Sequence, residues 1–197
     1  MIELIWLIPL LPLIGFLING IGQHILPKSL IGVIGSGVVL ASFLISCGIF
    51  STVYEARVAG DAAVFTQEIF NWIKVGNLSI SLSFLVDPLS SIMLLIVTGI
   101  GFLIHVYSIG YMHKDKGFGK FFAYLNLFIF FMLLLVLGSN YLVMFIGWEG
   151  VGLCSYLLIG FWYTNDSYAS AAKKAFVMNR IGDLGFLLAV FFIFYAF

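Results

Sequence analysis

Apolar residues dominate the chain in six long runs that are separated by more polar connections. A helix needs about 20 mainly apolar residues to cross the hydrocarbon core of a bilayer, which is about 30 Å thick. Six runs approach or exceed this length: 2–22, 30–53, 88–110, 120–137, 141–163 and 174–197. The pattern predicts an all-α polytopic membrane protein whose six transmembrane helices form a bundle.

The longest polar connection lies between the second and third runs, at about residues 54–87. Within it, residues 78–84 alternate strictly between apolar and serine positions, which indicates a β-strand. Gly76-Asn77 comes just before and suits a tight turn. We predict a short hairpin on the membrane surface, with Trp72 at the interface.

Prolines mark two of the predicted helix starts. Pro9 and Pro12 should kink the first helix or shift its beginning, because proline lacks the N–H that a helix interior needs. Asp87 precedes Pro88 at the start of the third run, where an aspartate is a good N-cap and a proline fits the first turn.

Basic residues are distributed unequally between the two sides of this arrangement. One side carries six lysines, and the other carries Arg57 and Lys74. Loops rich in lysine and arginine face the cytoplasm, so we predict that the N-terminus and the hairpin are extracytoplasmic. The six lysines are Lys28, Lys114, Lys116, Lys120, Lys173 and Lys174.

The composition narrows the class further. The chain is 62% hydrophobic and 9% charged, whereas a soluble domain carries about 25% charged residues. Its net charge of zero argues against a nucleic-acid partner. Its His, Cys and carboxylate residues lack the spacing of a metal site, and we expect this chain to bind no metal, cofactor or redox centre. Because the last apolar run reaches Phe197 without a polar stop, we expect a longer protein.

Two carboxylates and one guanidinium interrupt the last two runs. Glu149 lies nine positions after Asn140, and Asp183 lies nine positions after Lys174. At 1.5 Å per residue, each is about 14 Å from its end of the membrane. Since the two helices run in opposite directions, both carboxylates should lie near the midplane. Arg180 is spaced i,i+3 from Asp183, so these two can pair.

Ionisable groups at mid-membrane are costly and mark functional sites by default. A carboxylate between a desolvating environment and a movable cation can switch its protonation state, as a proton relay requires. The alternative is that Glu149 and the pair Arg180–Asp183 only hold helices together. His105, near the end of the third run, could pass protons to the adjacent loop, or it could be a packed residue.

Several motifs resemble the L subunit of bacterial complex I, which is chain 5 of the mitochondrial enzyme. The most specific one is GWEGVGLCSYLLIGF over residues 147–161, and further similar motifs lie within about residues 70–190. These are Asp87-Pro88-Leu89-Ser90, the stretch from Val97 to His105, and Arg180-Ile181-Gly182-Asp183. The resemblance implies an antiporter-like, proton-pumping subunit that is related to the large subunits of Mrp-type antiporters.

The family pattern implies roles for these residues. Glu149 matches the helix-five glutamate, which in the family pairs with a lysine on a later, broken helix. Arg180 and Asp183 match charged sixth-helix positions, and His105 matches a position that L-type members share. The resemblance implies the bacterial inner membrane, lipid, protons and other complex I membrane subunits as partners. It also implies NADH, FMN, iron–sulfur clusters and quinone in other subunits.

On this basis we expect three regions. Residues 1–60 form the first two helices, 61–135 form a chain-5-type N-terminal region, and 136–197 begin the proton-conducting domain. The leading hypothesis is a proton-translocating subunit of NADH:quinone oxidoreductase without a redox centre of its own, inactive as an isolated fragment. The alternatives are a large subunit of an Mrp-type Na⁺/H⁺ antiporter and a structural membrane anchor.

Overall fold

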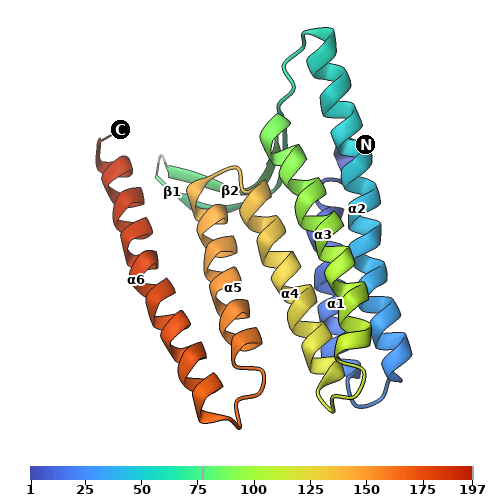
Figure 1. Ribbon diagram of the computed structural model, residues 1–197. Coiled ribbons are helices and arrows are strands. Elements are labelled where there is room, and N and C mark those ends of the chain that lie inside the picture. Colours follow the sequence, from blue (N-terminus) through green and yellow to red (C-terminus); the bar gives the residue numbers. More distant parts are fainter. Residues whose placement is uncertain (77, 197) are drawn as a thin grey trace.

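The computed structural model describes residues 1–76 and 78–196, and these residues form a helical bundle with one β-hairpin (Figure 1). Six of the helices in the described residues are long and apolar enough to cross a membrane, which confirms the predicted all-α polytopic fold. A short 3₁₀ segment, η1 (Ile2–Leu4), precedes them. The helices are α1 (Leu7–Gly22), α2 (Lys28–Ala59), α3 (Pro88–Tyr111), α4 (Phe118–Leu137), α5 (Tyr141–Ile159) and α6 (Asp166–Ala196).

Two helices extend beyond the apolar runs that predicted them. α6 begins at Asp166, eight residues early, because the Asn165 side chain accepts a hydrogen bond from the Ser167 amide and starts the helix there. α2 continues to Ala59 and ends where Gly60 adopts a φ of 83°, a left-handed conformation that glycine tolerates well. Hydropathy therefore indicates the part of a helix that suits lipid, while capping residues set where the helix stops.

The first helix starts later than its apolar run, in line with one of the two effects predicted for its prolines. Pro9 lies in the first turn of α1, where a missing N–H removes few helical bonds. Pro12 lies inside the helix and cannot bond the carbonyl of Ile8, four residues earlier. The hydroxyl of Ser42 on α2 donates to that carbonyl at 2.9 Å instead.

The start of α3 is as the sequence predicted. The Asp87 carboxylate accepts a hydrogen bond from the Ser90 amide at 2.7 Å, and the Ser90 hydroxyl accepts one from the Asp87 amide at 2.7 Å. Pro88 occupies the first helical turn. This capping box satisfies donors that the helix leaves unbonded.

The predicted hairpin is present and is longer than expected. β1 (Phe65–Val75) pairs antiparallel with β2 (Leu78–Val86). Gly76 has a φ of 56°, as a tight turn requires, and the other predicted turn residue, Asn77, lies outside the described residues. β1 escaped prediction because its register shifts twice, between Glu68 and Phe70 and between Asn71 and Ile73, which breaks the apolar alternation.

The hairpin lies across one end of the bundle and binds two separate segments (Figure 1). The hydroxyls of Ser83 and Ser139 are hydrogen-bonded, and the Asn140 side chain donates to the carbonyl of Ser81 at 2.8 Å. At the other strand, the Gln67 amide group donates to the carbonyl of Glu3 at 3.1 Å. The hairpin therefore connects η1 with the link between α4 and α5. Its position on the extracytoplasmic side remains a prediction.

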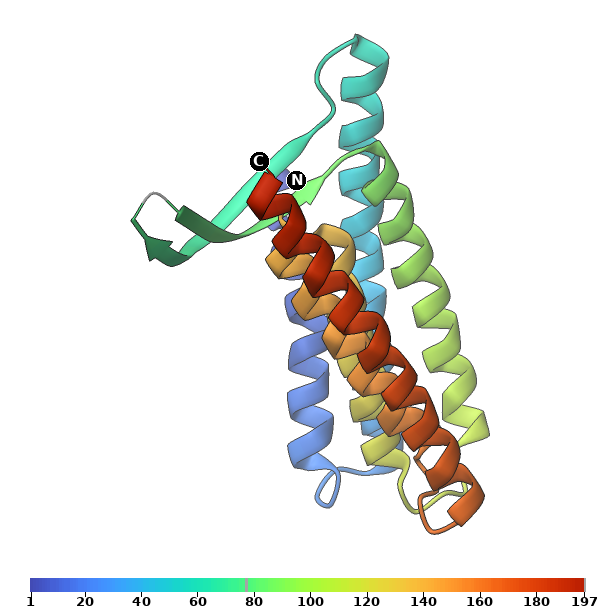
Figure 2. The same ribbon diagram turned by 90° about the vertical axis from the view of Figure 1, so that its left-hand side faces the viewer.

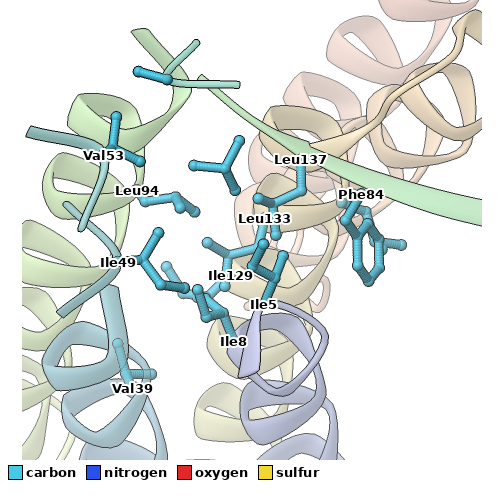
Figure 3. Close-up of a cluster of buried hydrophobic side chains, with 13 residues drawn as sticks. Ile5, Ile8, Val39, Ile49, Val53, Phe84, Leu94, Ile129, Leu133 and Leu137 are labelled. Atoms are coloured by element: carbon cyan, nitrogen blue, oxygen red, sulfur yellow. The ribbon is translucent and has the colours of Figure 1, made fainter. Parts of the chain in front are cut away.

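Helices α1 to α4 pack around a shared apolar core, and α5 and α6 extend the bundle to one side (Figure 1). In the view of Figure 2, this side faces the reader and α6 lies in front. α4 contacts both α1 and α5, whereas the principal contact of α6 is with α5. The main core cluster lies toward the hairpin, and Figure 3 shows it. A second cluster, toward the opposite end, consists of Ile31, Met112, Phe118 and Phe122.

The opposite end of the bundle carries the six lysines of the predicted cytoplasmic side. There, the ammonium of Lys28 donates to the carbonyls of His113 and Asp115. The Asp115 carboxylate accepts hydrogen bonds from the Trp162 indole at 2.9 Å and from the Gly117 amide at 2.6 Å. The Trp162 bond connects the α3–α4 loop to the α5–α6 loop. The bonds from Trp162 and Gly117 hold the pKa of Asp115 below its ordinary value, the Trp162 bond most strongly.

Candidate functional site

The three charges singled out in the sequence meet between α5 and α6. Glu149 is on α5, near the middle of its 19 residues, and Arg180 and Asp183 are on α6. A guanidinium nitrogen, Nη1 of Arg180, forms an ion pair with Glu149 Oε2 and lies 3.5 Å from Asp183 Oδ2. One cation is therefore shared by two carboxylates from antiparallel neighbours.

The glycines around Glu149 explain how α5 presents it. A Cβ at Gly147 would lie 2.7 Å from the Leu135 Cα of α4, and one at Gly150 would overlap the Phe131 ring. Both glycines thus form the face of α5 that lies directly against α4. Since each residue turns the helix by about 100°, Glu149 lies well away from that face. The carboxylate therefore points toward α6 and its guanidinium.

Asp183 is held by a residue that the sequence reasoning did not identify. The Trp148 indole donates to Asp183 Oδ1 at 2.8 Å, so the two oxygens of this carboxylate face different partners. Trp148 is itself stacked on Phe186, with ring centroids 6.1 Å apart. The sequence contained a signal for such a bond. An indole N–H within an apolar span needs an acceptor, and Trp148 directly precedes Glu149.

Arg180 also rests on an aromatic ring of its own helix. Its guanidinium carbon lies 4.6 Å from the ring centroid of Phe176, one turn earlier. Such a cation–π contact stabilises a cation by about 0.5–2 kcal/mol. The sequence predicted the i,i+3 contact with Asp183, and the structure adds Glu149 and Phe176 as further partners.

The burial of the three side chains is graded. Asp183 is 8% exposed, Glu149 26% and Arg180 41%. A separate cavity of about 320 Å³ lies between α4, α5 and α6 and is lined by Trp148, Gly152, Ser155 and Asn179, among others. Asp183 is therefore the most enclosed of the three charged side chains, and Arg180 the most accessible.

This arrangement has a simple charge balance. Two ionised carboxylates face one guanidinium, so the group has an excess of one negative charge. Unpaired charge is costly in a low-dielectric environment, and binding a single proton would neutralise the group. When Glu149 is the protonated group, Arg180 still has Asp183 as its ionised partner. The two carboxylates thus compete for one guanidinium.

His105 lies elsewhere in the bundle. It is on α3 and is 1% exposed, its Nδ1 lies 2.7 Å from the carbonyl of Gly101, and its ring packs edge-on against Phe122 of α4. α4 lies between α3 and the α5–α6 charges, so the structure does not bring His105 together with them. Among residues 1–76 and 78–196, moreover, no group of three His, Cys, Asp or Glu side chains is arranged to hold a metal ion.

Comparisons with known proteins agree with this fold. The family described as "NADH-Ubiquinone oxidoreductase (complex I), chain 5 N-terminus" matches residues 72–122. The family described as "NADH:quinone oxidoreductase/Mrp antiporter, TM" matches residues 138–197, which contain all three charges. A polytopic bundle with this charged pair of spans is thus of the antiporter-like class of membrane subunits.

Curated relatives define the family more closely. NADH-quinone oxidoreductase subunit L of Rickettsia conorii is 43% identical over 184 residues, covering 93% of this chain and 27% of the relative. The subunit L of Escherichia coli is 42% identical over 94% of the chain and 30% of the relative. That of Mycobacterium tuberculosis is 53% identical over 66% of the chain and 21% of the relative. The chain belongs to the complex I subunit L (chain 5) family, and it spans less than a third of the length of these relatives.

Proposed function

We propose that this chain is part of a proton-translocating membrane subunit of an NADH-quinone oxidoreductase. The observation that carries the proposal is the Arg180 guanidinium shared by Glu149 and Asp183 within two apolar spans. The names of the relatives, each a subunit L of that enzyme, support it. In this proposal the cluster is a proton station near the midplane of the bilayer.

The proposed step uses the shared cation. A proton that reaches Glu149 neutralises the cluster, and Arg180 then moves toward Asp183, which the Trp148 indole holds in place. When the proton leaves, Glu149 regains its charge and attracts Arg180 again. Within the family pattern, a lysine on a later helix would compete for Glu149, and its approach would drive the release. The proposed route does not use His105, which packs against Phe122 of α4.

The remaining parts of the proposal concern the whole protein. We place NADH, FMN, iron–sulfur clusters and quinone in other subunits, and assign no redox centre to this chain. Its partners would be other membrane subunits, lipid and protons, without nucleic acid. Its location would be the bacterial inner membrane with the N-terminus outside, in line with the lysine distribution. The segment alone would hold only part of a route and would not pump.

The test replaces Glu149 by glutamine in the full-length protein within its assembled complex. Glutamine keeps the shape of the side chain but cannot bind and release a proton. We expect proton pumping, measured with a pH-sensitive dye in vesicles, to fall on the order of tenfold or more, while the complex still assembles. Glu55→Gln is the matched control, because Glu55 is an exposed carboxylate near the far end of α2.

Three other outcomes would count against the proposal. Normal pumping by the Glu149→Gln variant would remove the carboxylate from the route. Impaired assembly with normal pumping by the assembled fraction would favour a structural anchor. A ΔpH that depends on Na⁺ and is independent of NADH oxidation would favour the Mrp-type antiporter instead.

A further inference from the structure

A second polar group lies inside the bundle, away from the charges between α5 and α6. Asn19 on α1 and Asn126 on α4 are both 0% exposed, and His105 on α3 is 1% exposed. One atom of each has no hydrogen-bond partner among the described residues: Asn19 Oδ1, Asn126 Oδ1 and His105 Nε2. Buried polar atoms are rarely left without partners, because each costs about 1–3 kcal/mol.

The three residues lie in one layer of the bundle, around Phe122 of α4. A Cβ placed at Gly35 of α2 would lie 3.1 Å from the Nδ2 atoms of both Asn19 and Asn126, so the two amides are neighbours. His105 packs against Phe122, which lies one turn before Asn126 on α4. Four helices thus contribute to the same layer of the bundle.

The chemistry of the unpartnered atoms is uniform. Asn19 Nδ2 already donates to the carbonyl of Ile31, and Asn126 Nδ2 donates to that of Phe122, which fixes each amide with its oxygen free. The Gly101 carbonyl can only accept, so the proton of a neutral His105 is on Nδ1 and its Nε2 is an acceptor. All three atoms therefore need donors.

Among residues 1–76 and 78–196, no donor forms a hydrogen bond with any of these three atoms. A neutral His105 has no second ring N–H to offer, because its single ring proton is on Nδ1. Three acceptors need at least two small molecules that each carry two donors. Water is such a molecule, and buried waters typically bond otherwise unsatisfied polar groups.

We propose that Asn19, His105 and Asn126 form an internal water-binding site. Apolar side chains close this layer on both sides. The cluster containing Val39, Ile129 and Leu133 lies toward the hairpin, and the cluster of Ile31, Met112, Phe118 and Phe122 lies toward the lysine-rich end. The bound water is therefore enclosed, and the site is distinct from the proton station between α5 and α6.

The first test needs no substitution. In the full-length protein in lipid bilayers, magnetisation transfer from water to ¹⁵N-labelled His105 is measured by solid-state NMR. We expect the ring signal to build up quickly compared with the methyl signals of Leu133, which is buried in the apolar cluster. A His105 signal that builds up as slowly as that of Leu133 would overturn the proposal.

The second test asks whether the asparagines hold the water. Asn126→Leu keeps a similar volume and removes the acceptor, and we expect loss of the rapid transfer to His105. Ser46→Ala is the matched control, because Ser46 is equally buried but already donates to the Ser42 carbonyl at 2.8 Å. Unchanged transfer in Asn126→Leu, or equal loss in Ser46→Ala, would contradict the assignment.

Discussion

At the scale of single residues, the indole of Trp148 determines how Asp183 is presented to Arg180. The Trp148 donor fixes one carboxylate oxygen and leaves the other to the guanidinium. We expect Trp148→Phe to keep the stacking on Phe186 but to lower the free energy of unfolding by about 1.5–3 kcal/mol, the range for a hydrogen bond to a charged group. Denaturant unfolding in detergent measures this.

A second tryptophan provides the comparison for that variant. Trp6→Phe changes an indole that is 41% exposed at the other side of the bundle, and it should leave unfolding within about 0.5 kcal/mol of the parent protein. Equal losses in the two variants would show that indole size, and not the bond to Asp183, is what matters.

The sequence identified the three charges but not all of their contacts. Depth along two antiparallel helices follows from counting residues, which is why Glu149 and Asp183 could be placed at one level. The direction of each side chain depends on which face of α5 packs on α4. That face is set by Gly147 and Gly150, and hydropathy carries no information about it. The Glu149–Arg180 pair therefore emerged only from the structure.

At the scale of elements, Ser42 on α2 compensates for a proline on α1. Pro12 leaves the Ile8 carbonyl without its helical donor, and Ser42 supplies one, although its hydroxyl also lies 3.1 Å from the Val38 carbonyl. We expect Ser42→Ala to destabilise the protein by about 1–3 kcal/mol, because the carbonyl is then unsatisfied.

A double-mutant cycle with Pro12→Ala tests whether the effect of Ser42 depends on the proline. In a Pro12→Ala background, the new N–H bonds the Ile8 carbonyl, so Ser42→Ala should cost less by about 1 kcal/mol. Strictly additive losses would show that Ser42 acts through Val38 or through packing alone.

The contact between α4 and α5 depends on the absence of side chains. We expect Gly147→Ala to cost about 1–3 kcal/mol through overpacking, because its methyl would press on the Leu135 backbone. Gly37→Ala is the control, since a Cβ there meets nothing within 4 Å, and it should be neutral or stabilising by up to about 1 kcal/mol. Thermal unfolding of the purified variants compares the two.

Helices and hairpin differed in how well they could be predicted. The apolar runs placed all six helices because the bilayer imposes a length of about 20 residues on each. β1 was missed because its register shifts disturb the alternation that revealed β2. The early start of α6 was missed because Asn165 and Asp166, which begin it, lie outside the apolar run.

At the scale of the whole molecule, the Asp115–Trp162 bond connects the two loops at the lysine-rich end. The pKa of Asp115 is lowered in the folded protein. The ionised Asp115 side chain therefore makes its full contribution to stability at pH values above the ordinary pKa range of a carboxyl group. This contribution is lost as the pH falls through the lowered pKa. We expect Trp162 fluorescence to report release of the loop below about pH 4.

Asp115→Asn separates this effect from general acid unfolding. The variant should lack the acid transition in Trp162 fluorescence, while the helical circular dichroism signal stays that of the parent protein. A transition that persists unchanged in the variant would assign it to another group.

The hairpin also determines which sequence changes α5 tolerates. Asn140 bonds the hairpin through Ser81 and at the same time caps α5 by accepting from the amides of Leu142 and Val143. Glu149 follows nine residues later, so one inserted or deleted residue between them would swing the carboxylate by about 100° around the helix axis and away from Arg180. In an evolving population, this stretch should accept many exchanges of one apolar side chain for another, yet almost no insertions or deletions.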